Sequence, residues 1–399
     1  MQKPKIRFKG YTEDWEQRKV SELCCISTGK SNTQDKVEDG EYPFYVRSPI
    51  IERSTKYLYD EEAVITVGDG VGTGKVFHYV NGKYDLHQRC YRMYDFLDEL
   101  NAHYFYYIFS KMFYKRVMAM TAKTSVDSVR LEMIADMKIP TPTIDEQMKI
   151  GVHFDSLNNL ITLHQRKCEQ IKKLKKYMLQ KMFPKNEKKV PKIRFNGFTD
   201  DWEQRKLDDM CTIITKQTVF DYSTTIKPSL VTTKENDTYS FIQNKDFEGM
   251  NINLKTDFYI PVSVAEKYPK ITLDQPSLLI SISGRIGNVG LYSLKSKAFI
   301  GGAVGICKLK DIEDGKTALY GLLAPVGQKH FSFLIKSSSH ANITVEDIRN
   351  IVLLLPKDKE EKMKINDYCS NLDQLITLHQ RRHEELIKLK KFMLQNMFI

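Results

Sequence analysis

A glycine-rich stretch near residue 70 carries residue types that can bind phosphate groups. Residues 68–75 read Gly-Asp-Gly-Val-Gly-Thr-Gly-Lys. A nucleotide-binding loop needs Gly-x-x-x-x-Gly-Lys followed by Ser or Thr, because its backbone and its lysine surround the phosphates. That spacing, ending at Lys75, requires glycine where Asp69 stands, and Val76 follows the lysine. The stretch therefore predicts either a glycine-rich hairpin whose backbone approaches a ligand closely or a purely structural turn.

Four histidine and cysteine residues could bind a metal ion. His379 and His383 are spaced one helical turn apart, and His164 and Cys168 occupy the matching places in an earlier copy of the same sequence. In an antiparallel pair of helices these four side chains would meet, and zinc prefers such nitrogen and sulfur ligands. A polar layer that fixes the register of two helices is the alternative that we favour. We therefore predict no metal site.

Motifs of DNA-modifying and DNA-cleaving catalysis are absent from the sequence. It contains no Asn-Pro-Pro-Tyr or Asp-Pro-Pro-Tyr segment, which adenine methyltransferases use to hold a flipped base. It also lacks a helicase-type phosphate loop and a set of carboxylates at nuclease spacing. These absences argue against a catalytic chain.

The overall charge favours an acidic partner. The 399-residue chain has a net charge of +11 and a pI near 9.0, and nucleic acid is the leading class of partner for such a chain. Eleven Lys and Arg residues against two acids lie between Arg166 and Lys192. They form either a solvated helix face and linker or a surface that contacts phosphates. The length predicts two to three domains.

Cysteine usage and hydropathy indicate the compartment. The seven cysteines form no Cys-x-x-Cys pair, which fits free thiols in a reducing cytoplasm. No signal peptide is recognised, and the longest unbroken aliphatic run, residues 351–355, is too short to span a bilayer. The sequence predicts a cytoplasmic protein without membrane contact.

Two long stretches repeat each other with helical periodicity. Residues 160–167 (Leu-Ile-Thr-Leu-His-Gln-Arg-Lys) return at 375–382 with one change. Apolar residues at steps of three and four predict a coiled-coil seam at Leu157, Leu160, Ile171, Leu174 and Met178, and at Leu372, Leu375, Leu386, Leu389 and Met393. Thr143 and Asp358 precede Glu146 and Glu361 by three residues, the pattern of a capping box. A helix from residue 144 to Met182 would be about 58 Å long, and the second copy is its expected partner.

Two shorter segments, which we call the opening segments, also repeat. Residues 4–20 and 191–207 share Pro-Lys-Ile-Arg-Phe and Asp-Trp-Glu-Gln-Arg-Lys, and each contains one of the two tryptophans. The inserts that follow, residues 21–135 and 208–345, share almost no sequence. Their alternating, aromatic-rich patterns predict strands at 42–46, 63–67, 75–80 and 88–94, and at 239–243, 277–283, 288–294 and 304–309. A constant frame around two unlike inserts suits a protein whose halves read two different things.

Each insert is predicted to close in the same way. A Ser/Thr-rich turn (121–125; 337–344) precedes a short helix (126–134; 345–350) and an apolar strand (137–140; 351–356). A longer helix is predicted at 103–120 in the first insert, and residues 185–190 form a charged linker between the copies.

This arrangement resembles the specificity subunit of type I restriction-modification enzymes over essentially the whole chain. The resemblance is carried by the Trp-Glu-Gln-Arg-Lys segments, the strand leading into residues 139–142, the helix start at 145–147 and the paired long helices. Residues 68–70 and 283–287 also look like turns of that family's recognition domains. Glu361-Lys362 replaces Glu146-Gln147 in the second copy, but the glutamate is retained.

The resemblance implies an α+β protein with two mixed α/β target-recognition domains. They would be separated by two long antiparallel helices that form a coiled-coil spacer, with an internal pseudo-two-fold repeat. We place the first recognition domain at 1–142, its spacer helix at 143–184, the linker at 185–190, the second recognition domain at 191–357 and its spacer helix at 358–399.

The resemblance also implies a function in bacterial defence. Each variable domain would read one half of a bipartite target in double-stranded DNA, and the helices would set the spacing and dock two methyltransferase (modification) subunits. Restriction/translocase subunits would join in the full complex. This chain would need no cofactor, whereas the partner subunits would use S-adenosylmethionine, ATP and Mg. Two alternatives are a stand-alone nuclease or methylase, against which the missing motifs speak, and a coiled-coil adaptor protein, against which the charge and the two unlike domains speak.

Polar and basic residues in predicted loops of the inserts are the candidates for DNA binding. Arg and Lys can pair with guanine and Gln or Asn with adenine, although phosphate contacts outnumber base contacts. In the first insert the candidates are Lys75, His87, Gln88, Arg89, Lys123, Thr124 and Ser125. In the second they are Ser283, Arg285, Asn288, Ser337, Ser338, Ser339 and His340.

Overall fold

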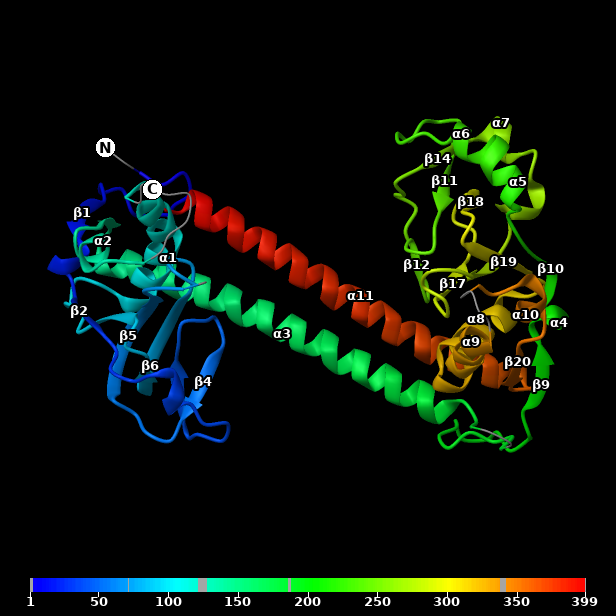
Figure 1. Cartoon of the computed structure of the whole chain (residues 1–399), viewed down its shortest axis with the longest axis horizontal. Helices are drawn as coiled ribbons and strands as arrows, with labels where there is room; N and C mark the ends of the chain where they lie inside the picture. The colour runs from blue at the N-terminus through cyan, green and yellow to red at the C-terminus, as the bar shows by residue number, and fades with distance from the viewer. Residues whose placement is uncertain (1–2, 71, 121–127, 186–187, 338–341, 399) are drawn as a thin grey trace. The chain divides into compact units, whose positions relative to one another are not determined.

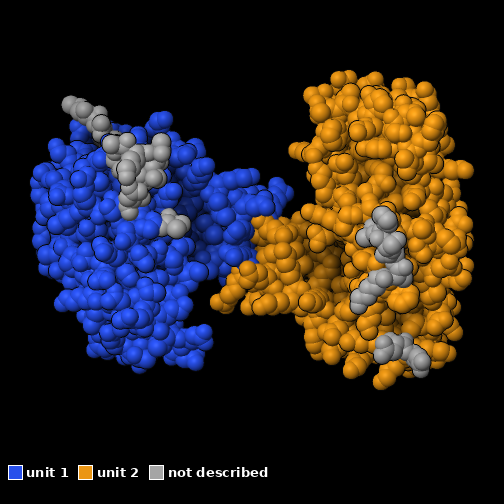
Figure 2. Space-filling view, in the orientation of Figure 1, with its two compact units in different colours: residues 1–165, 381–399 blue, residues 166–380 orange. Residues whose placement is uncertain are grey.

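The computed structural model describes residues 3–70, 72–120, 128–185, 188–337 and 342–398. The chain divides into two compact units, residues 1–165 with 381–399 and residues 166–380, which Figure 2 colours separately. The predicted turn at 121–125 and part of the one at 337–344 lie outside the described residues. Of the helices that the structure describes, none is long and apolar enough to cross a membrane.

The first unit is built on a six-stranded sheet against which a helix packs (Figure 1). Its strands lie in the order β2 (Cys25–Thr28), β7 (Cys90–Tyr94), β5 (Tyr59–Val67), β6 (Phe77–Leu86), β3 (Tyr42–Tyr45) and β4 (Ile51–Ser54). Helix α1 (Ala102–Ala119) begins at Asn101, whose side chain accepts a hydrogen bond from Tyr104 N at 3.0 Å. Phe109 of α1 is fully buried and meets Phe77 of β6 edge to face at 5.6 Å. This aromatic contact packs α1 against the sheet.

The second unit contains two four-stranded sheets. One has the order β10 (Cys211–Lys216), β19 (Val304–Leu309), β16 (Ser277–Ser281), β17 (Val289–Tyr292). The other has the order β14 (Tyr259–Pro261), β11 (Thr238–Ile242), β18 (Ala298–Ile300), β15 (Thr272–Leu273). Its insert also contains α5 (Val219–Asp221), a π-helix (Tyr222–Ile226), α6 (Lys227–Ser229), β12 (Phe247–Glu248), β13 (Asn251–Ile252), α7 (Val262–Ala265), a 3-10 helix (Pro269–Ile271), α8 (Ile312–Leu323) and α9 (Pro325–Ser337).

The two inserts contain the same sheet although their sequences differ. The orders β2-β7-β5-β6 and β10-β19-β16-β17 match, and every neighbouring pair in both is antiparallel. A parallel pair then follows in each insert, β3 with β6 and β11 with β18. The internal repeat therefore includes the inserts and is not limited to the opening segments and the long helices.

Each unit also has the same closing frame. In the first unit β1 (Glu16–Lys19) pairs with β8 (Lys138–Thr141), which follows α2 (Leu131–Ala135). In the second unit β9 (Glu203–Lys206), followed by α4 (Leu207–Met210), pairs with β20 (Val352–Leu355), which follows α10 (Val345–Arg349). Both opening segments thus supply the sequence Glu-Gln-Arg-Lys to a two-stranded sheet beside the start of a long helix.

The long helices are α3 (Ile144–Met182) and α11 (Lys359–Asn396). In the first unit the first part of α3 packs against the end of the second copy, where Phe154 stacks on Phe398 at 5.6 Å. In the second unit the last part of α3 packs against the first part of α11, where Lys175 forms an ion pair with Asp373. The predicted helix over residues 144–182 is confirmed.

The buried side of these helices follows a heptad repeat that differs from the predicted one. Side chains with reduced exposure alternate in steps of four and three at Leu157, Ile161, His164, Cys168, Ile171, Lys175, Met178 and Met182, and at Leu372, Ile376, His379, His383, Leu386, Lys390, Met393 and Met397. The predicted positions Leu160, Leu174, Leu375 and Leu389 are each 43% exposed. The predicted seam is therefore wrong at these positions, because it passes instead through Ile161 and Ile376 and through the unexpected Lys175 and Lys390. His164, Cys168, His379 and His383 also lie on this side of the helices, where the favoured polar layer places them.

The glutamates at the helix starts bind the opening segments. Arg7 donates from Nε and Nη2 to the two carboxylate oxygens of Glu146, at 2.8 Å each. Arg194 donates in the same way to Glu361, at 2.7 and 2.8 Å. Both carboxylates are buried, and a bidentate arginine satisfies a buried carboxylate better than one backbone N–H does. The predicted capping box is thus wrong for the two glutamate side chains.

Candidate nucleic-acid interface

In each unit, strand ends meet at one edge of the sheet. In the first unit Val67, at the end of β5, pairs with Cys90 at the start of β7. In the second unit Ser281, at the end of β16, pairs with Val304 at the start of β19. We call the loops at these edges the first loop edge (residues 29–33, 47, 68–70, 72–76 and 87–89) and the second loop edge (217–222, 243–246, 282–288 and 301–303). Every described candidate residue except Ser337 lies in one of these two edges.

Two arginines share one carboxylate at the first loop edge. Arg47 Nη1 donates to Asp69 Oδ1 at 3.3 Å, and Arg89 Nε lies 3.7 Å from Asp69 Oδ2. The Arg89 side chain is 65% exposed and that of Arg47 is 47% exposed. One acid therefore orients two solvent-facing cations and leaves a net positive charge at the edge. Arg89 was predicted from the sequence, whereas Arg47 was missed.

The turn that carries Gln88 and Arg89 is held in place by hydrogen bonds. Gln88 donates from its side-chain amide to Asn32 Oδ1 and from its backbone to Ser31 O, the latter at 2.8 Å. His87 is only 4% exposed, and its Nδ1 accepts from Arg89 N at 3.0 Å. Burial, followed by the charge of Arg47, lowers the pKa of His87. His87 thus holds the turn in place, and its burial argues against the predicted direct contact with DNA.

Lys75 lies at the end of the glycine-rich hairpin between β5 and β6. Its ammonium is 4.9 Å from the centre of the Tyr114 ring on α1, and the side chain is exposed. Gly70 and Gly74 have φ of +83° and +66°, which glycine adopts without strain. β5 and β6 pair as an antiparallel hairpin on either side of this stretch, which agrees both with a ligand-approaching hairpin and with a purely structural turn. The neighbouring candidates Lys123, Thr124 and Ser125 lie outside the described residues.

The second loop edge has a different composition. Arg285 is exposed on the turn 283–287, and it has no ion-pair partner among the residues that the structure describes. Asn288 donates its side-chain amide to Asn244 O at 3.0 Å and to Phe247 O at 2.6 Å. Asn244 in turn donates to Ser283 O at 3.1 Å. Asn288 is therefore a support for the edge, while Arg285 is free to contact a ligand.

The remaining candidates of the second insert cannot be placed in detail. Ser337 is the last residue of α9, and Ser338, Ser339 and His340 lie outside the described residues. Asn244, which precedes the short strand β12, was not among the predicted residues. In the sequence, Asn244 is separated from the turn 283–287 by about forty residues. Arg47 follows β3 and Asn244 follows β11, the strands that form the parallel pairs with β6 and β18. The correspondence between Arg47 and Asn244 is therefore visible only once β3 and β11 are recognised as equivalent strands.

In both units the chain returns to the loop edge just before the closing strand. Val129 N donates to Gly68 O at 2.7 Å, and Ile343 N donates to Ile282 O at 2.9 Å. The residues that follow α1 and α9 are thereby tied to equivalent points of the two edges.

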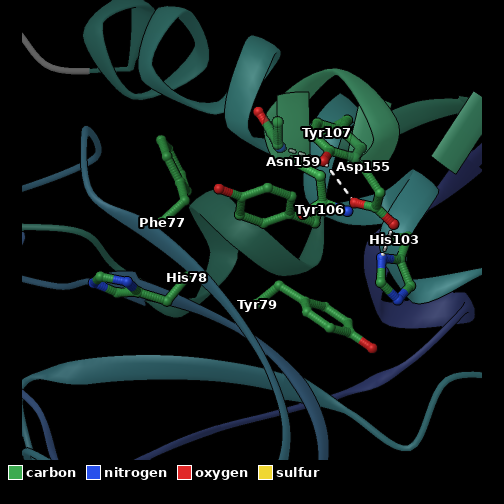
Figure 3. Close-up of a pocket in the computed structure, with 9 residues that line it drawn as sticks. Phe77, His78, Tyr79, His103, Tyr106, Tyr107, Asp155 and Asn159 are labelled. Carbon is green, nitrogen blue, oxygen red and sulfur yellow. Dashed lines mark hydrogen bonds and ion pairs between the residues drawn. The ribbon is translucent and has the colours of Figure 1, made fainter. Parts of the chain in front are cut away.

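A cavity of about 510 Å³ lies in the first unit where β6, α1 and α3 meet (Figure 3). Tyr107 donates to Asp155 at 2.7 Å, His103 Nδ1 lies 2.6 Å from the other oxygen of Asp155, and Asn158 donates to Tyr107 at 2.6 Å. Burial, with the hydrogen bond to Asp155, raises the pKa of Tyr107. The nine lining residues include no Ser, Thr, Cys or Lys, and the Asp155 carboxylate is engaged by both Tyr107 and His103.

An equivalent junction occurs in the second unit. Tyr320 of α8 lies 3.1 Å from Ser370 Oγ and donates to Asp373 Oδ2 at 3.2 Å. Ser370 and Asp373 match Asp155 and Asn158 at the repeat offset of 215 residues. The polar network therefore joins a recognition-domain helix to a long helix in both units, which is a positioning role. No group of three or more His, Cys, Asp or Glu within the described part of the chain could hold a metal ion.

The two loop edges, each carrying exposed cations on a rigid sheet, and the duplicated helical frame define a two-domain recognition protein. The family described as "Type I restriction modification DNA specificity domain" matches residues 12–173 and 199–388, and the chain belongs to this family.

Relatives and solved structures agree with this assignment. The chain is 24% identical to the type I restriction enzyme MjaVIII specificity subunit of Methanocaldococcus jannaschii over 400 residues, which covers 95% of this chain and 91% of the relative. It is 25% identical to the type I restriction enzyme EcoDI specificity subunit of Escherichia coli over 167 residues, 42% of this chain and 36% of the relative. The structure of the S subunit of a type I restriction-modification system from M. genitalium has the same fold, with a TM-score of 0.71, 15% identity and coverage of 100% and 99% of the two chains.

Proposed function

We propose that the protein is the DNA-reading subunit of a type I restriction-modification complex and that each loop edge reads one half of a bipartite target. The observation that carries this proposal is that the described base-reading candidates, Ser337 excepted, gather at equivalent edges of two equivalent sheets. The frame around the edges is repeated, whereas the edge residues differ. Arg89 follows β6 in the first unit, while Ala303 follows β18 in the second. Two edges with different donors suit two half-sites with different sequences.

The charge of the edges supports binding to duplex DNA. Arg47 and Arg89 share a single acid, and Arg285 has no ion-pair partner among the described residues. Arginine can donate two hydrogen bonds to guanine or contact phosphate. Because the supporting residues His87 and Asn288 already hold their turns, these arginines are presented on preformed loops and lose little freedom on binding.

The exposed sides of the long helices support docking of two copies of one partner. In the first unit Leu160 and Leu163 of α3 and Leu389 and Phe392 of α11 are between 41% and 52% exposed. At the repeat offset, the second unit exposes Leu375 and Leu378 of α11 and Leu174 and Tyr177 of α3 to a similar degree. Apolar patches of this kind mark interaction sites. Since the same patch occurs once in each unit, we propose that one methyltransferase subunit docks on each, and that restriction/translocase subunits join the assembled complex.

Chemistry in this complex would belong to the partners. The methyltransferase and translocase subunits would use S-adenosylmethionine, ATP and Mg, and this chain would bind, orient and space the DNA. The cytoplasm is the compartment in which such a complex meets its DNA. A structure entitled "Structural basis underlying complex assembly and conformational transition of the type I R-M system" shares this fold, with a TM-score of 0.51, 16% identity and coverage of 97% and 98%.

The proposal is tested by comparing exposed cations at the two ends of each sheet in the assembled complex. Arg89→Ala and Arg285→Ala remove cations at the loop edges. Lys19→Ala and Arg349→Ala remove exposed cations that lie near the opposite ends of β2 and β10, where Lys19 pairs with Asp136 and Arg349 with Asp208. Arg89→Ala should alter protection of one half-site and Arg285→Ala that of the other in DNA footprinting, while the controls behave like wild type. Equal effects of edge and control substitutions would refute the proposal.

A further inference from the structure

The second loop edge carries two large apolar side chains that point into solvent. Val219 is 85% exposed and Phe220 is 74% exposed, more than any other large apolar residue that the structure describes. They form the first turn after β10, in the short helix α5, which lies beside β18 in Figure 1. A fully exposed Val-Phe pair contributes nothing to the core of the domain, so its position requires another explanation.

The turn that carries Val219 and Phe220, which we call the tip (residues 217–221), is held in place by hydrogen bonds in spite of its exposure. Thr218 Oγ1 accepts from Asp221 N at 3.0 Å and donates to Asp221 Oδ2 at 2.5 Å. Phe220 O accepts from Ser223 Oγ at 3.1 Å and from Thr224 Oγ1 at 2.7 Å. The chain continues directly into the π-helix Tyr222–Ile226, a rare conformation that occurs frequently at functional sites. The tip is therefore a preformed projection.

The tip belongs to the same edge as Arg285. Gln217, 4% exposed, donates from its side-chain amide to Ile300 O and so ties the start of the tip to the end of β18. A cavity of about 340 Å³ separates Val219 from Asn244, Gly301 and Gly302. Asn244 donates to Ser283 O at 3.1 Å, next to the turn of Arg285. The exposed lysines Lys216 and Lys227 flank the tip in sequence. An apolar projection with an exposed lysine on either side of it in the sequence thus stands on the proposed DNA-binding edge.

Among the described residues of the first loop edge, no large apolar side chain is exposed. After β2 the chain continues with Lys30, Ser31 and Asn32, whose backbone and side chains are engaged by Leu86, Asp85 and Gln88. At the positions of Gly301 and Gly302, counted from the ends of β18 and β6, the first unit has His87 and Gln88, which carry side chains. The absence of side chains at the two glycines leaves room beside the tip for a close approach of the DNA backbone.

We propose that Phe220 is a wedge that enters a base step of the half-site read by the second recognition domain, whereas the half-site read by the first domain stays stacked. Proteins that bend DNA insert an apolar side chain between base pairs in this way and surround it with cations. The inference rests on the proposed function, because it assumes that the second loop edge binds duplex DNA.

The test uses the assembled complex and a duplex carrying its target, located by methylation mapping. Bases in both half-sites are replaced one at a time by 2-aminopurine, whose fluorescence rises when its stacking is lost. The wild-type complex should raise the fluorescence at one step of the second half-site and at none of the first. Phe220→Ala should abolish the rise and weaken binding about five- to hundred-fold, the range found when a stacking aromatic is removed. Phe220→Leu should retain the rise, because leucine also acts as a wedge. Phe333→Ala, which removes another exposed phenylalanine (72%) of the same unit, is the matched control and should change nothing.

Failure of the wedge can be distinguished from failure of the proposed function. If the wild-type complex shows no rise in the second half-site, or if Phe220→Ala keeps the rise, the wedge is refuted. If Arg285→Ala weakens binding in that case, the proposed function stands without the wedge. If neither Arg285→Ala nor Phe220→Ala changes the affinity, the second loop edge does not bind DNA and both proposals fail.

Discussion

Replacing Arg194 by alanine should strongly destabilise the second unit. Arg194 makes two charge-assisted hydrogen bonds to Glu361, at 2.7 and 2.8 Å, and the carboxylate is 1% exposed. The variant leaves this carboxylate buried with a single weak donor, Trp202 Nε1 at 3.3 Å. Removing one partner of a buried ion pair costs about 3–5 kcal/mol, because the remaining charge is uncompensated. We expect a loss of that size.

The control is an ion pair of the same residue types on the surface. Arg381 donates to Glu385 at 2.9 Å, but its side chain is 77% exposed. Water and salt screen an exposed ion pair of this kind, so Arg381→Ala should leave the free energy of unfolding nearly unchanged. The difference between the two variants isolates the effect of burial, since both remove an arginine that pairs with a glutamate.

The assay is urea denaturation of the full-length chain followed by tryptophan fluorescence. The protein has two tryptophans, and a Trp15→Phe background leaves only Trp202, which lies beside Glu361 and reports on the second unit. In the double variant Arg194→Met with Glu361→Gln, part of the loss should be recovered because no buried charge remains unpaired. A loss below about 1 kcal/mol for Arg194→Ala, or no difference from Arg381→Ala, would refute the reasoning.

Three further predictions concern the helical frame. Residues 1–187 alone should form a symmetric dimer, which light scattering can detect. In the full chain Met397 and Phe398 are buried in the core of the first unit, and Met182 and Phe183 of a second copy, their repeat equivalents, can replace them. A folded monomer would contradict this prediction. Inserting one heptad after Arg166 and after Arg381 keeps the seam and adds about 10 Å to each helix. If helix length sets the gap between half-sites, the mapped methylation sites should lie roughly three base pairs further apart. An active variant with an unchanged gap would refute this prediction. Leu163→Glu and Leu378→Glu should each remove one methyltransferase subunit from the complex in native mass spectrometry, and retention of both subunits would exclude these patches as docking sites.

The sequence was sufficient to predict the frame because the frame is repeated. The helix 144–182 and the closing strands could be inferred, since two copies of one pattern reinforce each other, whereas the pairing of the opening segments with these strands is visible only in the structure. The seam was misplaced because Leu160 and Ile161 are both apolar, and the true heptad accepts His164 and Lys175. The role of Glu146 was missed because its partner, Arg7, is about 140 residues away.

The equivalence of the two inserts could not be predicted from the sequence. The two sheets are built from different side chains, and alternation of apolar and polar residues predicts a strand but not its position in the sheet. For the same reason Arg89 and Arg285 could be named from residue type and loop position, while Arg47 and Asn244 could not. Phe220 was not among the predicted residues, because an apolar pair next to a predicted strand is expected to be buried, and only the structure shows that this pair is exposed.

Exchanging residues 21–135 for the corresponding insert of a relative tests the central claim most directly. The long helices, the second insert and the opening segments stay unchanged, so the complex should assemble with its methyltransferase subunits as before. Mapping methylated bases in cells that carry the complete system then reports the target. One half-site should change while the other half-site and the gap are retained. A change in both half-sites, or in neither, would contradict the assignment of one loop edge to one half-site.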